Sequence, residues 1–401
     1  MVSAYAELEE RMRGRLGGRE CLYVPSCRFG LYLALRHWCR PGGRVLMSPV
    51  NDDVIFFVVL AAGLRPVQAP LDPRDGSIDT AAVPESVWQG LSAVLTTNLY
   101  GNPDPAPELR AHCDRLGIPL IEDAAHAIGS TVGGRPVGTY GEASVFSLSK
   151  HTAAKTGGFL ALADPALREE LAAARDALLH PTRATAELAY LVRPYAEATA
   201  RRLRLVGAAR AAVRLLGLEE REEIRMPLRA DALERALPAA PALEPFHSWV
   251  RVDMHDYRLR PGSGRLRRTT RRFARLDGVL DAHRAGTARL SAAEYGTPRV
   301  SETSPEPVQP LFRVPLLVAD RDAAAAALAR HRITTGYLYD PPLDSYAGGV
   351  FTDLSPAPEP AAWFARHALP VDPRRADEVL AVLRGAGIRP AQPSEALGGA
   401  R

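Results

Sequence analysis

Short apolar runs alternate with amphipathic stretches between residues 21 and 163, and this alternation restricts the possible folds more than any other feature. The amphipathic stretches lie at 31–39, 54–62 and 106–116 and have helical periodicity. The apolar runs are CLYV (21–24), RVLMS (44–48), RPVQAP (65–70), SAVLTT (92–97), IPLIE (118–122), ASVFSL (143–148) and GFLALA (158–163). Short, non-alternating runs of this kind are typical of buried strands. We therefore predict an α/β fold, with a mostly parallel seven-stranded sheet covered by helices on both faces.

The rest of the chain predicts a helical segment and a second, smaller α/β unit. Residues 168–228 are rich in Arg and Ala and favour long helices. The later unit contains FRVPLLV, an Ala-rich helix at 321–331, ITTGYLY, ALPVD and a last helix at 375–385. We predict a large domain at 1–245, a small C-terminal domain at 246–390 and a disordered tail at 391–401.

Two segments leave alternatives open. Apolar side chains at near-helical spacing in 186–216 favour a subunit contact over a lipid contact. The most basic stretch, at 258–276, favours a solvated helix face, with a clamp for a phosphorylated substrate as the alternative. Nucleic acid is disfavoured as a partner, because no aromatic side chains interleave these arginines.

Composition limits the classes of function. The formal net charge of +4 over 401 residues gives little support for general polyanion binding. The four cysteines show neither a CxxC pair nor zinc-ligand spacing, so we expect reduced thiols in a cytoplasmic protein and no metal site. The first twenty residues are charged throughout, and no window resembles a transmembrane segment.

The chain carries nearly all its cations as arginine. Of 50 Lys and Arg residues only Lys150 and Lys155 are lysines, and both lie in FSLSKHTAAKTGG after the run at 143–148. A GC-rich genome explains the general scarcity of lysine. The two exceptions indicate chemistry that needs a primary amine, because arginine does not lose its proton.

A carboxylate and an imidazole come close to this amine in the predicted fold. Asp123 and His126 lie in DAAHAIGS, directly after the run at 118–122. The carboxyl ends of parallel strands meet at one edge of a sheet, so acid, imidazole and amine converge there. A capping Asp and a core His are the structural alternative.

That combination suits pyridoxal 5′-phosphate (PLP). The cofactor needs an amine for its Schiff base and a carboxylate that keeps the pyridine nitrogen protonated. Its phosphate needs backbone amides at a helix N-terminus and hydroxyl groups. The motif PSCRFGL opens the first helix and offers Ser26 and the amides of Cys27 and Arg28, and Ser147 is a further donor.

These motifs resemble the DegT family of sugar aminotransferases, which are fold-type I PLP enzymes, over nearly the whole chain. The resemblance rests on GIPLIEDAAHAIGSTVGGRPVGTYGEASVFSLSK, PSCRFGLYLALRHW, RITTGYLYDPPL and ALPVDP. It implies Asp123 at the pyridine nitrogen, His126 against the ring or its 3′-oxygen, and Ser147 at the phosphate. Lys150 would be the Schiff-base and proton-shuttle residue, and its distance from the following Gly pair favours it over Lys155.

The resemblance has departures. Arg28 replaces a Thr of the phosphate turn, residues 51–53 replace an aromatic that stacks on the cofactor, and Asp372 replaces a late His. The substrate side is therefore expected to differ from that of the usual nucleotide-linked keto-sugar enzymes.

The resemblance implies a homodimeric aminotransferase. Such an enzyme would transfer an amino group from a donor such as glutamate to a keto-sugar, expected to be nucleotide-linked, or to a related ketone in a biosynthetic pathway. One alternative is a PLP-dependent sugar dehydratase or lyase, a branch in which His replaces the lysine; here His151 follows Lys150. Another is a non-catalytic partner protein with the same fold. A nicotinamide-dependent dehydrogenase is excluded, because no GxGxxG follows the first strand.

Overall fold

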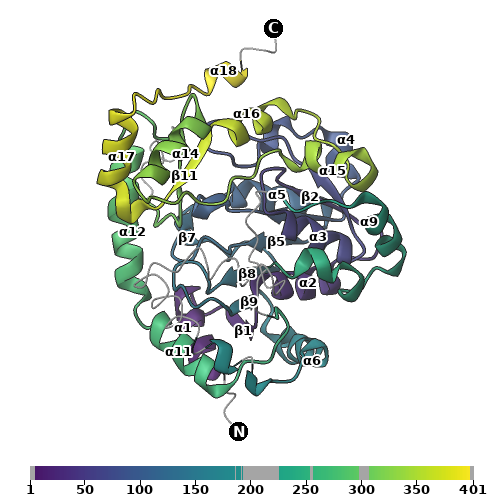
Figure 1. The fold of residues 1–401 in the computed structure, drawn as a ribbon. Helices are drawn as coiled ribbons and strands as arrows, with labels where there is room; N and C mark the ends of the chain where they lie inside the picture. The colour runs from purple at the N-terminus through teal and green to yellow at the C-terminus, as the bar shows by residue number, and fades with distance from the viewer. Residues whose placement is uncertain are drawn as a thin grey trace.

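The centre of the molecule is a seven-stranded sheet in the order β1-β9-β8-β5-β4-β2-β3 (Figure 1). This computed structural model describes residues 5–185, 187–190, 192, 225–252, 256–297 and 307–397. The strands are β1 (Glu20–Val24), β2 (Arg44–Met47), β3 (Arg65–Gln68), β4 (Ala93–Thr96), β5 (Leu120–Asp123), β8 (Ala143–Ser147) and β9 (Gly158–Leu162). Only β9 runs antiparallel to its two neighbours, β1 and β8. The predicted mostly parallel sheet of seven strands is confirmed.

Helices cover both faces of this sheet because successive side chains of each strand point to opposite sides. In β2, Val45 and Met47 pack into the core beneath one helical layer, whereas Leu46 packs into the core of the other face. The first layer comprises α2 (Cys27–Trp38), α3 (Asp53–Ala61), α6 (Arg168–Leu178), α9 (Ala230–Ala236) and α10 (His247–Val250). The second comprises α1 (Ala6–Arg15), α4 (Glu85–Gln89), α5 (Ala106–Leu116), α11 (Ser263–Phe273) and α16 (Glu359–His367).

A second, smaller core lies beside the sheet. Its strands β10 (Val314–Leu317) and β11 (Ala368–Val371) pair antiparallel and pack against α14 (Arg321–Arg330) and α17 (Ala376–Gly385). The long helix α12 (Leu276–Ser291) joins the two units, running from α11 toward α17 in Figure 1.

The hydrophobic packing changes from one core to the other within α12, whereas the sequence predicts a domain boundary at residues 245–246. Phe246 and Trp249 are buried in the core of the large sheet, and so are Leu276 and Leu280 at the start of α12. Leu290, near the end of α12, belongs to the second core. The packing therefore divides the chain within α12, because one helix buries each half against a different core.

The C-terminal part also differs from expectation in two places. Residues 333–340, which contain ITTGYLY, form neither helix nor strand, and α15 (Leu343–Phe351) returns the chain to the large core. The tail predicted to be disordered from residue 391 is placed as far as 397. The Ala391 amide donates to the Leu317 carbonyl at 3.1 Å, and α18 covers Ser394–Leu397.

The Arg- and Ala-rich segment is helical where it is described. It contains α6 and, farther on, helical residues at 184–185, 187–190 and 192. Residues 193–224, and with them most of the apolar stretch at 186–216, lie outside the described residues. No helix in the described ranges is long and apolar enough to cross a bilayer.

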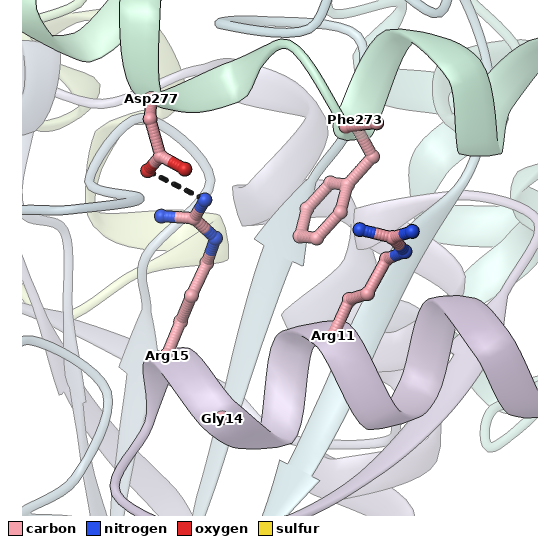
Figure 2. A pocket seen from close by; sticks show the side chains of 6 residues that line it. Arg11, Gly14, Arg15, Phe273 and Asp277 are labelled. Atoms are coloured by element: carbon pink, nitrogen blue, oxygen red, sulfur yellow. Dashed lines mark hydrogen bonds and ion pairs between the residues drawn. The ribbon is translucent and has the colours of Figure 1, made fainter.

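The basic stretch at 258–276 forms α11 and its approach. Two of its arginines, Arg258 and Arg265, are buried and lie 2.8 Å from Glu244 and Glu187, so these two already form ion pairs within the fold. A hollow of about 170 Å³ lies between α1 and α11. Figure 2 shows the side chains around it. Its lining residues are Arg11, Gly14, Arg15, Phe273, Ala274 and Asp277, and both arginines form ion pairs. The hollow contains none of the predicted site residues.

Candidate active site

The predicted acid and amine lie at one edge of the sheet. Strands β5 and β8 pair in parallel, with Asp123 opposite Val145, so both strands end on the same side. Asp123 is the last residue of β5, Ser147 is the last residue of β8, and Lys150 follows in the next turn. The parallel register therefore brings together residues that are more than 20 positions apart.

The Asp123 carboxylate is buried and incompletely satisfied. The residue is 4 % exposed, and its Oδ1 accepts a hydrogen bond from the Ala125 amide at 3.0 Å. The Cys27 thiol lies 3.9 Å from the same oxygen, and Oδ2 accepts no hydrogen bond from the described residues. Burial raises the pKa of Asp123 to about 7. Such a carboxylate suits a ligand that brings a positive charge.

The Lys150 amine lies between aromatic rings. Its Nζ is 5.6 Å from the ring centroid of Phe312 and 5.8 Å from that of Tyr337. It forms no hydrogen bond or ion pair with another described residue. Burial lowers the pKa of Lys150, while the charge of Asp52 opposes this shift. The amine is thus more easily deprotonated than an exposed lysine, as a nucleophile requires.

Lys155 has different surroundings. Its side chain is exposed, and its backbone has a φ of +67°, in a turn that leads into β9. Of the two lysines, only Lys150 acts electrostatically on Asp123 and His126. The surroundings of Lys150 therefore suit a reactive amine better than those of Lys155.

The His126 ring belongs to an aromatic stack. It is nearly parallel to the rings of Phe312 and Tyr100, with centroid distances of 5.2 and 6.3 Å. Neither ring nitrogen hydrogen-bonds to a described residue. Burial, followed by the charge of Lys150, holds the pKa of His126 well below its usual value. A neutral imidazole with both nitrogens available suits a ligand contact better than a core role.

The predicted phosphate cradle is only partly as expected. Ser26 caps α2: its Oγ accepts from the Phe29 amide at 3.3 Å and donates to the Tyr257 carbonyl at 3.0 Å. The hydrogen of this hydroxyl is therefore already used in a hydrogen bond within the protein. The first-turn amides of α2, which include those of Cys27 and Arg28, point out of the helix end and suit an anion.

Two serine hydroxyls lie close to these amides, those of Ser147 and Ser149. The sequence predicts only Ser147 as a phosphate ligand. Ser147 Oγ lies 2.8 Å from Ser149 Oγ. Gly158 lets this part of β9 approach α2, because a Cβ there would lie 2.3 Å from the Phe146 carbonyl oxygen and 3.2 Å from the Cys27 nitrogen. The Arg28 guanidinium is turned to the Tyr257 ring, 5.5 Å from its centroid.

Sequence reasoning missed the segment 309–313, which closes one side of the site. The amides of Phe312 and Arg313 both donate to the Tyr100 carbonyl, at 2.9 and 3.2 Å. His151 Nε2 donates to the Pro310 carbonyl at 3.0 Å, and His283 Nδ1 to the Leu311 carbonyl at 2.8 Å. No local motif marks this segment, because tertiary contacts alone place it at the site.

The donor set fits PLP. An amine, a buried carboxylate and an imidazole, each with unfilled hydrogen-bonding capacity, face one region, and a helix N-terminus with two hydroxyls lies beside them. The residues that would hold the cofactor are Lys150, Asp123, His126, Ser147 and Ser149, with the α2 amides.

Residues 3–287 match the model of the DegT/DnrJ/EryC1/StrS aminotransferase family. The chain belongs to this family. Among the curated proteins, this family member is 31 % identical to the UDP-N-acetyl-3-dehydro-alpha-D-glucosamine 3-aminotransferase of Acidithiobacillus ferrooxidans, over 42 % of this chain and 47 % of that protein. It is 40 % identical to the L-glutamine:2-deoxy-scyllo-inosose aminotransferase of Streptoalloteichus tenebrarius, over 35 % of this chain and 34 % of that protein. The chain thus spans less than half the length of the curated relatives it matches.

Solved structures show the same fold over most of the chain. A DegT DnrJ EryC1 StrS aminotransferase from Brucella abortus matches with a TM-score of 0.65 at 18 % identity, covering 96 % of this chain and 90 % of that one. A GDP-4-keto-6-deoxymannose-3-dehydratase matches with a TM-score of 0.66 at 16 % identity, covering 96 % and 93 %. At these identities the likeness establishes the fold-type I architecture.

Proposed function

We propose that the protein is a PLP-dependent aminotransferase that converts a keto-sugar, nucleotide-linked or not, or a related cyclic ketone into an amine. The amino group comes from an amino acid such as glutamate. One observation carries the proposal: Lys150, Asp123 and His126 converge at one sheet edge with hydrogen-bonding groups that no described residue fills. The names of the two relatives, which act on a keto-sugar and a cyclic keto-polyol, support the substrate class.

The chain's own residues have distinct tasks in this reaction. When bound, PLP supplies an electron sink for the substrate carbon. The buried Asp123 carboxylate would favour a proton on the ring nitrogen, because a buried carboxylate is stabilised by a neighbouring cation. The Lys150 amine would hold the cofactor covalently, and its Nζ could also accept and donate a proton. His126 would contact the ring, and the α2 amides with Ser147 and Ser149 would bind the phosphate.

The position of His151 favours transamination over dehydration. His151 is 5 % exposed and its Nε2 is bonded to the Pro310 carbonyl, so this imidazole is turned into the fold. Burial lowers the pKa of His151 to about 3, so the ring stays neutral. Of these two neighbours, the Lys150 amine lies against the aromatic wall of the site, whereas the His151 imidazole is bonded to the Pro310 carbonyl, which disfavours the dehydratase alternative.

The test is a reaction with purified protein. PLP-loaded protein is mixed with glutamate or glutamine and a panel of keto-sugars and keto-polyols, and the products are analysed by mass spectrometry. We expect an aminated ketone together with the oxo-acid of the donor. A deoxygenated ketone without stable amine transfer would identify a dehydratase, and absence of any cofactor band would contradict the proposal as a whole.

A further inference from the structure

The loop that carries Lys150 has a strained backbone. It connects β8 to β9 over residues 148–157, and two of its residues that are not glycine have positive φ angles, +49° at Ala153 and +67° at Lys155. The left-handed region is unfavourable for residues with a Cβ, so such residues persist only where surrounding contacts hold them. The loop therefore needs support from other parts of the fold.

Two side chains from outside the loop supply this support. The Tyr190 hydroxyl donates a hydrogen bond to the Ala154 carbonyl at 2.6 Å, and the Arg272 guanidinium, from α11, donates to the Ala153 carbonyl. Within the loop, the Ala153 amide donates to the Lys150 carbonyl at 3.0 Å. A movement of residues 153 and 154 would therefore move the Lys150 backbone as well.

Tyr190 is itself held in place by buried neighbours. It is 4 % exposed, and the Arg265 guanidinium carbon lies 4.5 Å from its ring centroid. Arg265 is buried as well and lies 2.8 Å from Glu187, which precedes Tyr190 by three positions in the same helical stretch. Packing of this kind gives the hydroxyl a defined position, which a group that orients another residue requires.

We propose that Tyr190 is a positioning residue for Lys150. Its hydroxyl holds the loop in the conformation that places the Lys150 amine 5.6 Å from the Phe312 ring centroid. Without this hydrogen bond the strained loop relaxes, and the amine loses its place in the site. The helical stretch at 187–190, which is distant from Lys150 along the chain, thereby determines whether the site is assembled. The reactive role of Lys150 rests on the proposed function, whereas the placement of its amine does not.

The first test measures the Lys150 amine in cofactor-free protein. Only Lys150 and Lys155 are lysines, so brief labelling with acetic anhydride followed by peptide mass spectrometry reports each amine separately. Tyr190→Phe deletes the hydroxyl and keeps the ring. We expect its Lys150 to show a labelling pKa closer to that of an exposed lysine and a plateau rate at least about threefold higher, because a loosened loop exposes the amine to water. Lys155, already exposed, should be labelled as in the wild type.

Tyr295→Phe is the matched control. The Tyr295 side chain is also buried, and its hydroxyl donates to a backbone carbonyl, that of Ile388, at 2.9 Å, but in the second core. Each variant loses one hydrogen bond of the same kind, so the two should unfold at similar urea concentrations. Only Tyr190→Phe should change the labelling of Lys150.

A second variant removes the other support of the loop. Arg272→Gln, which deletes the hydrogen bond to the Ala153 carbonyl, should change the Lys150 labelling in the same direction as Tyr190→Phe. Arg271→Gln, at the neighbouring exposed position, is its control and should match the wild type. This pair still tests the loop if Tyr190→Phe protein does not fold, which circular dichroism checks.

The PLP-loaded enzyme separates positioning from substrate binding. Tyr190→Phe should lower kcat at least about tenfold, because a small displacement of the reacting amine slows the chemical step. The KM values for the amino donor and the ketone should stay within about twofold of wild type, since the lost hydrogen bond is to the loop backbone and not to a substrate.

Two results would overturn the inference. One is a Lys150 labelling profile in Tyr190→Phe and Arg272→Gln that matches the wild type. The other is an equal change of that profile in Tyr190→Phe and Tyr295→Phe, which would indicate a general loosening of the fold. If wild-type protein does not load PLP, the proposed function fails, but the labelling of cofactor-free protein still tests Tyr190 separately.

Discussion

The two lysines show how strongly the surroundings decide what a residue can do. They lie five positions apart, yet Lys150 is placed against Phe312 and Tyr337 and has a lowered pKa, whereas Lys155 is exposed. A primary amine is chemically sufficient at either position. Desolvation makes Lys150 suited to covalent catalysis, because burial favours the uncharged form of the amine.

Replacement of each lysine tests this difference directly. Lys150→Ala protein should lose the cofactor adduct that borohydride traps, and its transamination rate should fall by at least about 10³-fold, because the amine both anchors the cofactor and moves the proton. Lys155→Ala should keep the adduct and most of the activity. Peptide mapping of the reduced protein identifies the attachment site, and a label on Lys155 would refute the assignment.

Asp123 should make the stability of the cofactor-free protein depend on pH. Its pKa of about 7 in the fold lies above its usual value of 3.8, so the folded state binds more protons between these values. Stability therefore falls as pH rises through this window. Between pH 5 and pH 8 the loss from this group should be on the order of 2–3 kcal/mol.

Urea unfolding of wild type and Asp123→Asn at the two pH values measures that loss. The Asn variant should show a smaller decrease, and the difference should shrink when PLP is bound, because a cationic ring nitrogen stabilises the charged carboxylate. Equal pH dependence in the two cofactor-free proteins would show that Asp123 is not the titrating group. Asp123→Asn should also lower transamination by orders of magnitude, through loss of the electron sink.

At the scale of elements, β5 serves two purposes through adjacent residues. Asp123 faces the active site, whereas the fully buried Glu122 side chain points to the other side of the strand, as strand geometry requires. The Glu122 carboxylate accepts the amides of Gly138, Tyr140 and Gly141 at 2.7–2.8 Å. This anchors the loop that follows β6 (Thr131–Val132) and β7 (Arg135–Pro136) and leads into β8.

Glu122→Gln tests how much these three hydrogen bonds contribute to the stability of the fold. A Gln side chain has one oxygen where Glu has two, so it cannot accept all three hydrogen bonds in the same way. Its NH₂ group would instead face a backbone N–H, and two donors repel each other. We expect a loss of about 2–4 kcal/mol in the free energy of unfolding, measured with urea. Glu85→Gln, which removes an exposed pair with Arg115, is the control and should unfold like wild type. Equal stabilities of both variants would contradict the anchoring role.

Another element-scale feature is the turn after β4, which supports the segment 309–313. Gly101 has a φ of +99°, and a Cβ there would lie 2.7 Å from the His126 carbonyl oxygen and 3.2 Å from the Phe312 amide nitrogen. Only glycine permits both the conformation and the close approach. The turn thereby sets the distance between the strand that carries the acid and the segment that carries the aromatic wall.

At the scale of the whole molecule, we propose a homodimer with its active sites at the subunit interface, as the family resemblance implies. Leu188 and Val192 are 64 % and 50 % exposed and lie four positions apart, on one side of a helical stretch. Apolar side chains in such a position are more often a subunit contact than a membrane contact.

Light scattering at micromolar concentration tests the dimer. Wild-type protein should have twice the mass of one chain, and Leu188→Glu should weaken the dimer at least about tenfold, because a buried charge would lack a partner. Leu354→Glu, at a 53 % exposed position elsewhere on the chain, should remain dimeric. A monomer that keeps full activity on dilution would refute the proposal and would redirect attention to a lipid or carrier-protein role for the apolar stretch.

The sequence alone determined the sheet and the nature of the chemistry. Strand spacing and apolar runs are local properties, so all seven strands and helices such as α5 could be predicted within a few residues. The scarcity of lysine and the DAAH motif indicated Lys150, Asp123 and His126 as candidate site residues. Each lies at or just after the carboxyl end of a strand, and these strand ends lie at one edge of the sheet.

Only the tertiary structure decided the rest. The sequence predicts that Ser26 binds the phosphate, but its hydroxyl donates a hydrogen bond to the Tyr257 carbonyl, 231 positions away. Where the packing changes within α12 depends on which core each half of that helix covers. Phe312 carries no local signal, and its ring lies beside Lys150 because the Tyr100 carbonyl, in a distant turn, accepts a hydrogen bond from its backbone amide. Contacts between residues far apart in the chain depend on the whole packed fold, so no short stretch of sequence contains them.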